Sequence, residues 1–275
     1  MRINVPSAAR LAAAGAIVAT VGCAGPQGAS GKHAPPDAIP PQVSIAGGDV
    51  TTGVALGHLR ETHSVGGFRV ARTPVTVAQY RRCVSDGACS PPSVSTGACA
   101  GAPRNYGASY TDDGTRDDVP VTCATPEQAR AYCQWVGGDF PRIDQWLLAA
   151  RGPKVAHFPW GDMPATCEQR QRINPFQADA EACCGVSCTD PRVLRVGAHP
   201  KGDSPLGVSD VLLVPEMVRG DARSPFAGCS DPGGVCTVSG LMPGAADYVT
   251  ASGASKGQTS GAGAVGFRCA WPGGA

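Results

Sequence analysis

The number and spacing of the cysteines in this chain are compatible with metal binding or with disulfide formation. The sequence holds 13 cysteines among its 275 residues. Cys229 and Cys236 flank the turn-forming residues Ser-Asp-Pro-Gly-Gly-Val, and a second group forms the motif CCGVSC at residues 183–188. Thiolate clusters of this kind bind soft metals such as zinc, whereas in an oxidising compartment the same cysteines form disulfides. The compartment therefore decides which chemistry to expect.

The N-terminus has the pattern of a bacterial export signal. Arg2 and Arg10 supply positive charge, and Leu11–Val21 is an apolar run of 11 residues, too short to span a bilayer. Gly22 precedes Cys23, as in lipoprotein signals, although Thr20 is unusual three residues before the cysteine. We expect residues 1–22 to be a signal peptide and Cys23 to be lipidated. The alternative is an ordinary signal cleaved near residues 24–25.

Export predicts the location and the state of the cysteines. One lipidated cysteine tethers a protein to a membrane surface without spanning it. We expect a membrane-anchored lipoprotein of the bacterial cell envelope, with Ala24 favouring the outer membrane, or else a secreted protein. Without Cys23, 12 of the 13 cysteines remain, an even number that can form disulfides throughout. We therefore favour disulfides over a zinc site at residues 183–188.

Charge and composition divide the rest of the chain. A formal net charge of +1 with mixed signs gives no basic stripe, so nucleic acid is excluded as a partner. Residues 23–44 are rich in Pro, Gly and Ala and predict a tether. One globular domain is predicted over residues 45–271, with many turns because Gly and Pro are abundant.

Helix signals are few but well formed. Residues 76–87 and 125–138 each begin with a capping box, in which a threonine is followed three residues later by glutamine. A third helix is predicted over Ile143–Arg151, with Trp146 on its buried face, although Arg142 is a poor N-terminal cap. Short strands are predicted in the segments FRVAR (68–72), KVAHFPW (154–160), RVGAHP (195–200), VLLVPEMV (211–218) and VGFRCAW (265–271).

Two short motifs resemble catalytic signatures but lack their structural context. Residues 261–266, GAGAVG, fit a dinucleotide-binding pattern, yet too few residues follow for a βαβ unit. Residues 253–257, GASKG, fit a nucleophile elbow, yet Gly, Ser and Thr surround them where a strand and a helix are needed. Neither motif predicts a site.

Several fragments, taken in order, resemble the formylglycine-generating enzymes, also called sulfatase-modifying factors. The resemblance covers residues 45–270 and is strongest in DFPRIDQWLLAARG (139–152) and FPWGD (158–162). The other fragments are IAGGDV, ETHSVGGFRV, PVTVAQYRRCV, VPVTCATPEQARAYCQW, VGAHPKGDSPLGVSDV and GFRC. It implies an α+β fold with low regular secondary structure, the complex C-type lectin-like fold, here disulfide-rich. In that fold the 139–152 segment is a scaffold helix.

The resemblance also implies an activity whose residues are poorly represented here. Active members use two nearby cysteines, shortly before the Gly-Phe-Arg motif, as a copper site that oxidises a sulfatase cysteine to formylglycine. The corresponding segment, residues 247–265, has no cysteine. Cys229 and Cys236 are the weak catalytic candidates, and a disulfide between them is the favoured alternative. Copper is therefore expected only if the protein is catalytic.

The calcium motif of the family is also altered. The family pattern G-N-V-W-E-W corresponds to LLVPEM at residues 212–217, in which only Glu216 matches. Asn174 matches another family ligand. Calcium prefers six or more oxygen ligands, so these two residues are weak candidates. The alternatives are a solvated Glu216 and a turn-forming Asn174.

Disulfide pairing is partly implied by the matched motifs. Cys133 in AYC and Cys269 in GFRC belong to two of them, and we expect these cysteines to pair. Local closures are expected for Cys83–Cys89, Cys99–Cys123 and Cys229–Cys236. The remaining cysteines, which would form two further bridges, are Cys167, Cys183, Cys184 and Cys188. Twelve cysteines permit many pairings, so the sequence leaves the full connectivity open.

These features predict an exported, lipid-anchored domain that is non-catalytic and acts as a binding or structural module with a protein or glycan ligand. The alternative is an active copper-dependent oxidase that matures sulfatases. A third hypothesis is an envelope spacer with no ligand. An apolar or aromatic concave patch would count against the spacer.

Overall fold

A computed structural model of the whole chain describes most of the predicted domain. The described residues are 1, 33–52, 61–92, 110, 114–153, 159–161, 195–211, 213–222, 229, 231, 234–240, 249–253 and 265–274. The chain divides into two units, Met1–Ser30 and Gly31–Ala275, and the second unit contains all the helices and strands named here. Among the described residues, no helix combines the length and apolar character needed to cross a membrane.

Three α-helices lie where the sequence predicts them: α1 (Val77–Ser85), α2 (Pro126–Trp135) and α3 (Ile143–Arg151). At the start of α2, the Thr125 hydroxyl accepts the Gln128 N–H at 3.2 Å, and the Gln128 side chain accepts the Thr125 N–H at 2.9 Å. Helix α1 begins with the same reciprocal pair. These bonds satisfy N–H groups that have no partner inside a helix, which explains why local sequence predicts both starting points.

The strands form three sheets. The first has the order β1-β4-β9, the second pairs β2 with β3, and the third has the order β7-β6-β5-β8. All described pairings are antiparallel except β5 with β8. The strands are β1 (Gln42–Ile45), β2 (Gly48–Thr52), β3 (Glu61–Val65), β4 (Phe68–Ala71), β5 (Glu216–Arg219), β6 (Val235–Gly240), β7 (Val249–Gly253), β8 (Gly266–Phe267) and β9 (Ala270–Pro272).

The strand predictions are only partly confirmed. Residues 68–72 contain β4, residues 265–271 contain β8 and most of β9, and residues 211–218 become strand only at β5. The strand predicted at residues 195–200 is wrong. This segment turns at Gly197, whose φ of 74° favours glycine, and its Val196 N–H donates to the Asp118 carbonyl. Most of residues 154–160 lie outside the described part of the chain.

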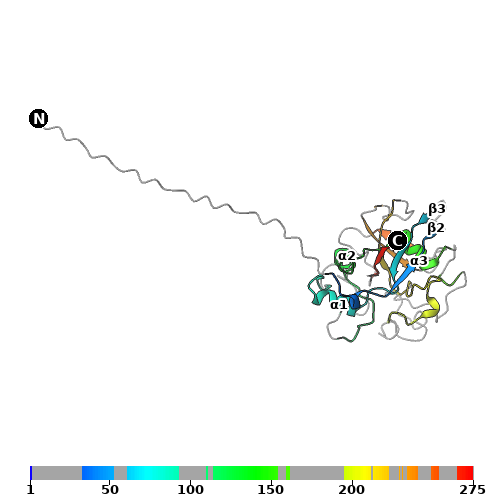
Figure 1. Cartoon of the computed structure of the whole chain (residues 1–275), viewed down its shortest axis with the longest axis horizontal. Helices are drawn as coiled ribbons and strands as arrows, with labels where there is room; N and C mark the ends of the chain where they lie inside the picture. Colours follow the sequence, from blue (N-terminus) through cyan, green and yellow to red (C-terminus); the bar gives the residue numbers. More distant parts are fainter. Residues whose placement is uncertain are drawn as a thin grey trace. The chain divides into compact units, whose positions relative to one another are not determined.

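Helix α3 supplies much of the main core. It packs against β2, β3 and β5, and Figure 1 shows it beside β2 and β3. Trp146 and Leu147 are each 1% exposed, which confirms the inward face predicted from helical spacing. The buried indole of Trp146 on this face agrees with the scaffold role that the sequence suggests for this segment.

A second core lies around α1, α2 and the C-terminal strands. The ring of Tyr132 lies 5.8 Å from those of Tyr80 and Phe267, and burial raises the pKa of both tyrosines. The structure pairs Cys133 of α2 with Cys269, one of the two residues between β8 and β9, and it also pairs Cys83 with Cys89. Both are pairs expected from the sequence. Cys123 is also disulfide-bonded, and its expected partner Cys99 lies outside the described residues.

Part of the segment expected to be a tether is folded onto the domain. Residues Pro36–Ala38 form the short 3-10 helix η1, and β1 begins at Gln42. The Ala34 N–H donates to the Trp135 carbonyl at 3.0 Å, and Ala38 is buried. Proline pre-sets the backbone of this segment, so docking it requires little additional ordering.

Candidate functional site

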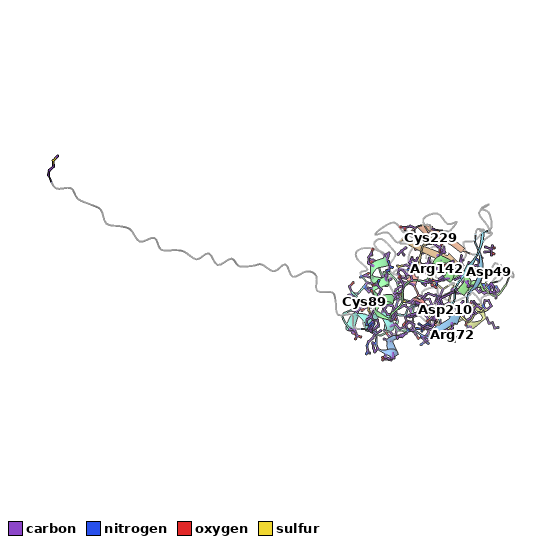
Figure 2. The ribbon with its side chains drawn as sticks, turned by 45° about the horizontal axis from the view of Figure 1, so that its top comes forward. Asp49, Arg72, Cys89, Arg142, Asp210 and Cys229 are labelled. Atoms are coloured by element: carbon purple, nitrogen blue, oxygen red, sulfur yellow. A yellow bond between two sulfur atoms is a disulfide. The ribbon has the colours of Figure 1, made fainter. Side chains whose placement is uncertain are left out.

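The candidate catalytic cysteines form a disulfide inside the main core. Cys229 and Cys236 are bonded to each other with a Cα–Cα distance of 5.5 Å, and neither side chain is exposed. Cys236 lies on β6 opposite Val218 of β5, and the Cys229 carbonyl accepts the Asp221 N–H. Figure 2 labels Cys229 among the side chains of this region. A soft metal needs free thiolates, so in this arrangement the pair does not fit copper.

Glu216 is fully buried and bonded on both carboxylate oxygens. Its Oε2 accepts from Trp146 Nε1 at 2.9 Å and from Arg268 Nε at 2.6 Å, and its Oε1 accepts from Arg268 Nη2 at 2.6 Å. The expectation of a solvated Glu216 is therefore wrong. Protein donors hold both oxygens that calcium would need, so the structure gives Glu216 a bracing role between α3, β5 and the β8–β9 segment.

The guanidinium of Arg268 is held equally firmly. Its Nη1 donates to the carbonyls of Ala71 and Arg72, and its Nη2 also donates to the Ser209 carbonyl. A buried ion pair is tolerated only when its remaining donors find acceptors, which is the case here. The Arg of the Gly-Phe-Arg motif is thus part of the same brace.

The remaining metal candidates cannot be placed. Asn174 and the cysteines of residues 167 and 183–188 lie outside the described residues. Within the described part of the chain, no three His, Cys, Asp or Glu side chains converge as metal ligands would.

An open cleft of about 530 Å³ lies between the β3–β4 turn, the α2–α3 connection and the C-terminal strand. Its volume falls in the range of small-molecule sites. Backbone of Gly66, Gly67, Gly137 and Gly273 forms part of its wall, and Phe68, Phe140 and Trp271 form a largely buried base. The polar side chains that line it are Asp139, Arg142, Gln145 and Arg219.

Ion pairs fix the charged wall of this cleft. Asp139 Oδ2 accepts from Arg130 Nη2 at 2.9 Å and from Arg219 Nη1 at 3.1 Å. Arg142, labelled in Figure 2, donates from Nε and Nη2 to the two oxygens of Asp144 at 3.0 and 2.9 Å. These pairs connect α2, the loop before α3, and β5, so three separate segments position the polar groups of the cleft.

Sequence reasoning missed this cleft. Arg219 and Asp139 are 80 residues apart, and no motif connects them. The local signal was the Gly137-Gly138-Asp139 run after α2, where Gly137 has a φ of 78° and a Cβ on Gly138 would lie 2.6 Å from the Ala270 carbonyl. Such glycines mark close approach of two backbones, which is where the cleft forms.

A titratable group lies outside the cleft, in the segment before β5. Burial raises the pKa of the Asp210 carboxyl to about 6, although the Gly197 N–H and the nearby Arg268 charge act in the opposite direction. The Gly197 N–H donates to Asp210 Oδ2 at 2.7 Å, and Asp210 has a φ of 59°. Arg72, labelled with Asp210 in Figure 2, donates from Nε to the hydroxyl of Ser209, the residue before Asp210, at 3.4 Å.

The fold and the site define a disulfide-braced α+β domain with a buried Glu–Arg–Trp brace and an open cleft that carries charged side chains. The profile of the family described as Sulfatase-modifying factor enzyme 1-like domain matches residues 29–272, nearly the whole chain. The chain therefore belongs to this family, and the resemblance found in its sequence motifs is confirmed.

Two relatives have names that describe oxidative enzymes. A hercynine oxygenase of Mycolicibacterium smegmatis is 27% identical over 203 residues, covering 62% of this chain and 43% of the relative. A formylglycine-generating enzyme of Thermomonospora curvata is 38% identical over 82 residues, covering 30% of this chain and 26% of the relative. The chain thus spans less than half the length of either relative.

Solved structures share the fold. PvdO from Pseudomonas aeruginosa superposes with a TM-score of 0.54 at 17% identity, covering 85% of this chain and 94% of PvdO. CarF gives a TM-score of 0.52 at 16% identity, covering 84% of this chain and 97% of CarF. The predicted fold class, mixed α and β with little regular structure and several disulfides, is confirmed.

Proposed function

We propose that this protein is an exported, lipid-anchored member of the family that has lost catalysis and acts as a binding module on the cell envelope. One observation carries the proposal: Cys229 and Cys236, the nearest closely spaced cysteine pair before the segment that corresponds to the family's copper site, are joined in a disulfide within the core. A buried disulfide offers no thiolate to a metal and no contact to a peptide substrate.

The cleft lined by Asp139, Arg142, Gln145 and Arg219 is the ligand site of this proposal. It has the volume of a small-molecule site, and its wall is made of charged and amide side chains that ion pairs hold in place. A spacer without a ligand needs no such cleft. The lipid anchor at Cys23 would hold the site at a membrane surface, and the described disulfides suit the oxidising compartment that export implies.

The test is a direct assay for the lost reaction. The folded full-length protein, supplied with copper and oxygen, is incubated with a peptide containing the sulfatase-type sequence Cys-x-Pro-x-Arg, and the peptide is weighed by mass spectrometry. We expect the peptide to return unchanged while the formylglycine-generating enzyme of Thermomonospora curvata converts it in parallel. Conversion of the peptide cysteine to an aldehyde by this protein would contradict the proposed loss of catalysis.

An oxidative enzyme is the second candidate, because the names of two relatives describe oxidative activities. If the peptide is converted, the variant Cys229→Ser with Cys236→Ser distinguishes two routes. Loss of conversion would assign the activity to these cysteines after reduction. Retained conversion would place the activity elsewhere in the chain.

A further inference from the structure

The charged side chains around the cleft differ in how far they are exposed to solvent. The three arginines are partly exposed, with side chains of Arg142, Arg219 and Arg130 exposed by 30%, 32% and 38%. Two of their carboxylate partners are more buried, Asp144 at 1% and Asp221 at 11%, whereas Asp139 at 29% is about as exposed as the arginines. An approaching molecule therefore meets three guanidinium groups but only one carboxylate.

In the wall of the cleft, several side-chain N–H donors have no hydrogen-bond partner among the described residues. A guanidinium has five N–H donors. With respect to the described residues, the Arg219 side chain uses only Nη1, on Asp139, and Arg142 uses Nε and Nη2, which leaves its Nη1 available. Gln145 accepts the Arg142 N–H through Oε1, and its side-chain NH₂ has no partner among the described residues. Donors therefore remain on all three side chains.

The side-chain oxygens of Asp139 and Gln145 in the same wall already accept hydrogen bonds. Asp139 Oδ2 accepts from both Arg130 and Arg219, and its Oδ1 accepts the Phe140 N–H at 2.8 Å. The Gln145 carbonyl oxygen is bonded to Arg142. A ligand that accepts hydrogen bonds therefore complements the free donors of this wall better than a ligand that mainly donates.

We propose that this cleft binds the oxyanion group of a small organic ligand, through the remaining N–H donors of Arg219, Arg142 and Gln145. The inference rests on the proposed function, because it assigns a ligand class to the binding module. Charge-assisted bonds from guanidinium to carboxylate, phosphate or sulfate oxygens are short and strong, and the planar guanidinium matches their geometry. The cleft has room for more than the anion itself, so the ligand is an organic molecule with an oxyanion group.

The test uses five probes on the full-length protein at constant ionic strength set with sodium chloride. Glutarate, phenyl phosphate and phenyl sulfate present the three oxyanions, while glucose and choline are the neutral and cationic probes. NMR of the arginine Nε–H resonances reports contact with Arg219 and Arg142, and isothermal titration gives dissociation constants. We expect saturable binding of at least one oxyanion. The probe that binds most tightly identifies whether the ligand carries a carboxylate, a phosphate or a sulfate.

Two substitutions with opposite effects separate ligand binding from a structural role. Arg219→Gln removes charge-assisted donors, and we expect about ten-fold weaker oxyanion binding. Asp139→Asn removes the carboxylate that competes for Arg219, so oxyanion binding should become tighter. The matched control is Arg195→Gln, which alters an exposed arginine paired with Asp118 away from the cleft and should leave binding unchanged.

Several outcomes would overturn the inference. They are the absence of saturable oxyanion binding, an effect that sodium chloride reproduces equally, or unchanged affinity in Arg219→Gln. Saturable binding of glucose or choline alone, detected at the cleft, would reject the oxyanion and leave the binding function standing. Conversion of the peptide cysteine in the assay above, with no probe bound, would reject both the inference and the proposed function.

Discussion

At the scale of single residues, two buried carboxylates of this domain have different surroundings. Glu216 receives three hydrogen bonds from Arg268 and Trp146. Among the described residues, Asp210 receives one hydrogen bond, from the Gly197 N–H, and its charge also faces Asp203 and Glu216. Burial disfavours an ionised carboxyl unless enough donors surround it, so Asp210 holds a proton more tightly than usual.

Asp210→Asn should remove a component of the pH dependence of stability. Since folding raises the pKa of this carboxyl from its ordinary 3.8 to about 6, the folded state binds the proton more tightly than the unfolded chain. The contribution of Asp210 to stability is full below about pH 4 and is lost as the pH rises through about 6. Relative to the variant, the wild type should lose about 2 kcal/mol of unfolding free energy between pH 4 and pH 7.

Urea denaturation at several pH values measures this difference. Asparagine suits the site because its side-chain oxygen can accept the Gly197 N–H and because asparagine tolerates a left-handed backbone such as the φ of 59° at this position. Parallel pH profiles for the two proteins would contradict the prediction.

At the scale of elements, the sequence predicts what local contacts determine. The starts of α1 and α2 follow from capping boxes within four residues, and both helices were predictable. Strands β6 and β7 were not, because their pairing depends on partners that no local pattern identifies. The same limit applies to the cleft, since Asp139 and Arg219 meet only after α3 and β5 have packed together. The family motifs located Trp146, Glu216 and Arg268 but gave no sign that they contact one another.

The Glu216–Arg268 brace should be a strong determinant of how α3, β5 and the β8–β9 segment pack. Glu216→Gln leaves the buried Arg268 charge without its counter-charge, and we expect a loss of about 3 to 5 kcal/mol in unfolding free energy. Asp118→Asn, which breaks the exposed pair with Arg195, is the control and should change stability by less than about 1 kcal/mol. Urea denaturation at neutral pH measures both.

A double variant tests whether the uncompensated charge is the cause. Glu216→Leu combined with Arg268→Met removes both charges, so it should be more stable than Glu216→Gln. Recovery should be incomplete because the carbonyls of Ala71, Arg72 and Ser209 lose the donors that Arg268 supplies. A double variant less stable than Glu216→Gln would show that these carbonyl contacts matter more than the charge.

At the scale of the whole molecule, disulfides connect segments that regular structure joins only weakly. Cys133–Cys269 links α2 to the C-terminal strands across a sequence separation of 136 residues, whereas Cys83–Cys89 closes a separation of 6. A cross-link restricts the unfolded chain more as the loop it closes becomes longer. The long bridge should therefore stabilise the domain far more than the short one, although both are buried.

Paired alanine variants measure this difference. Chain entropy alone predicts a loss of about 5 kcal/mol for Cys133→Ala with Cys269→Ala, and about 2 kcal/mol for Cys83→Ala with Cys89→Ala. Both variants replace buried sulfurs with the same side chain, so the cavity terms partly cancel in the comparison. Denaturation under non-reducing conditions gives the two unfolding free energies. Equal losses would mean that the unfolded chain already holds α2 near the C-terminal strands, so that closing the long loop adds little; a loss near 5 kcal/mol for the long bridge would mean that this one bond supplies much of the domain's net stability.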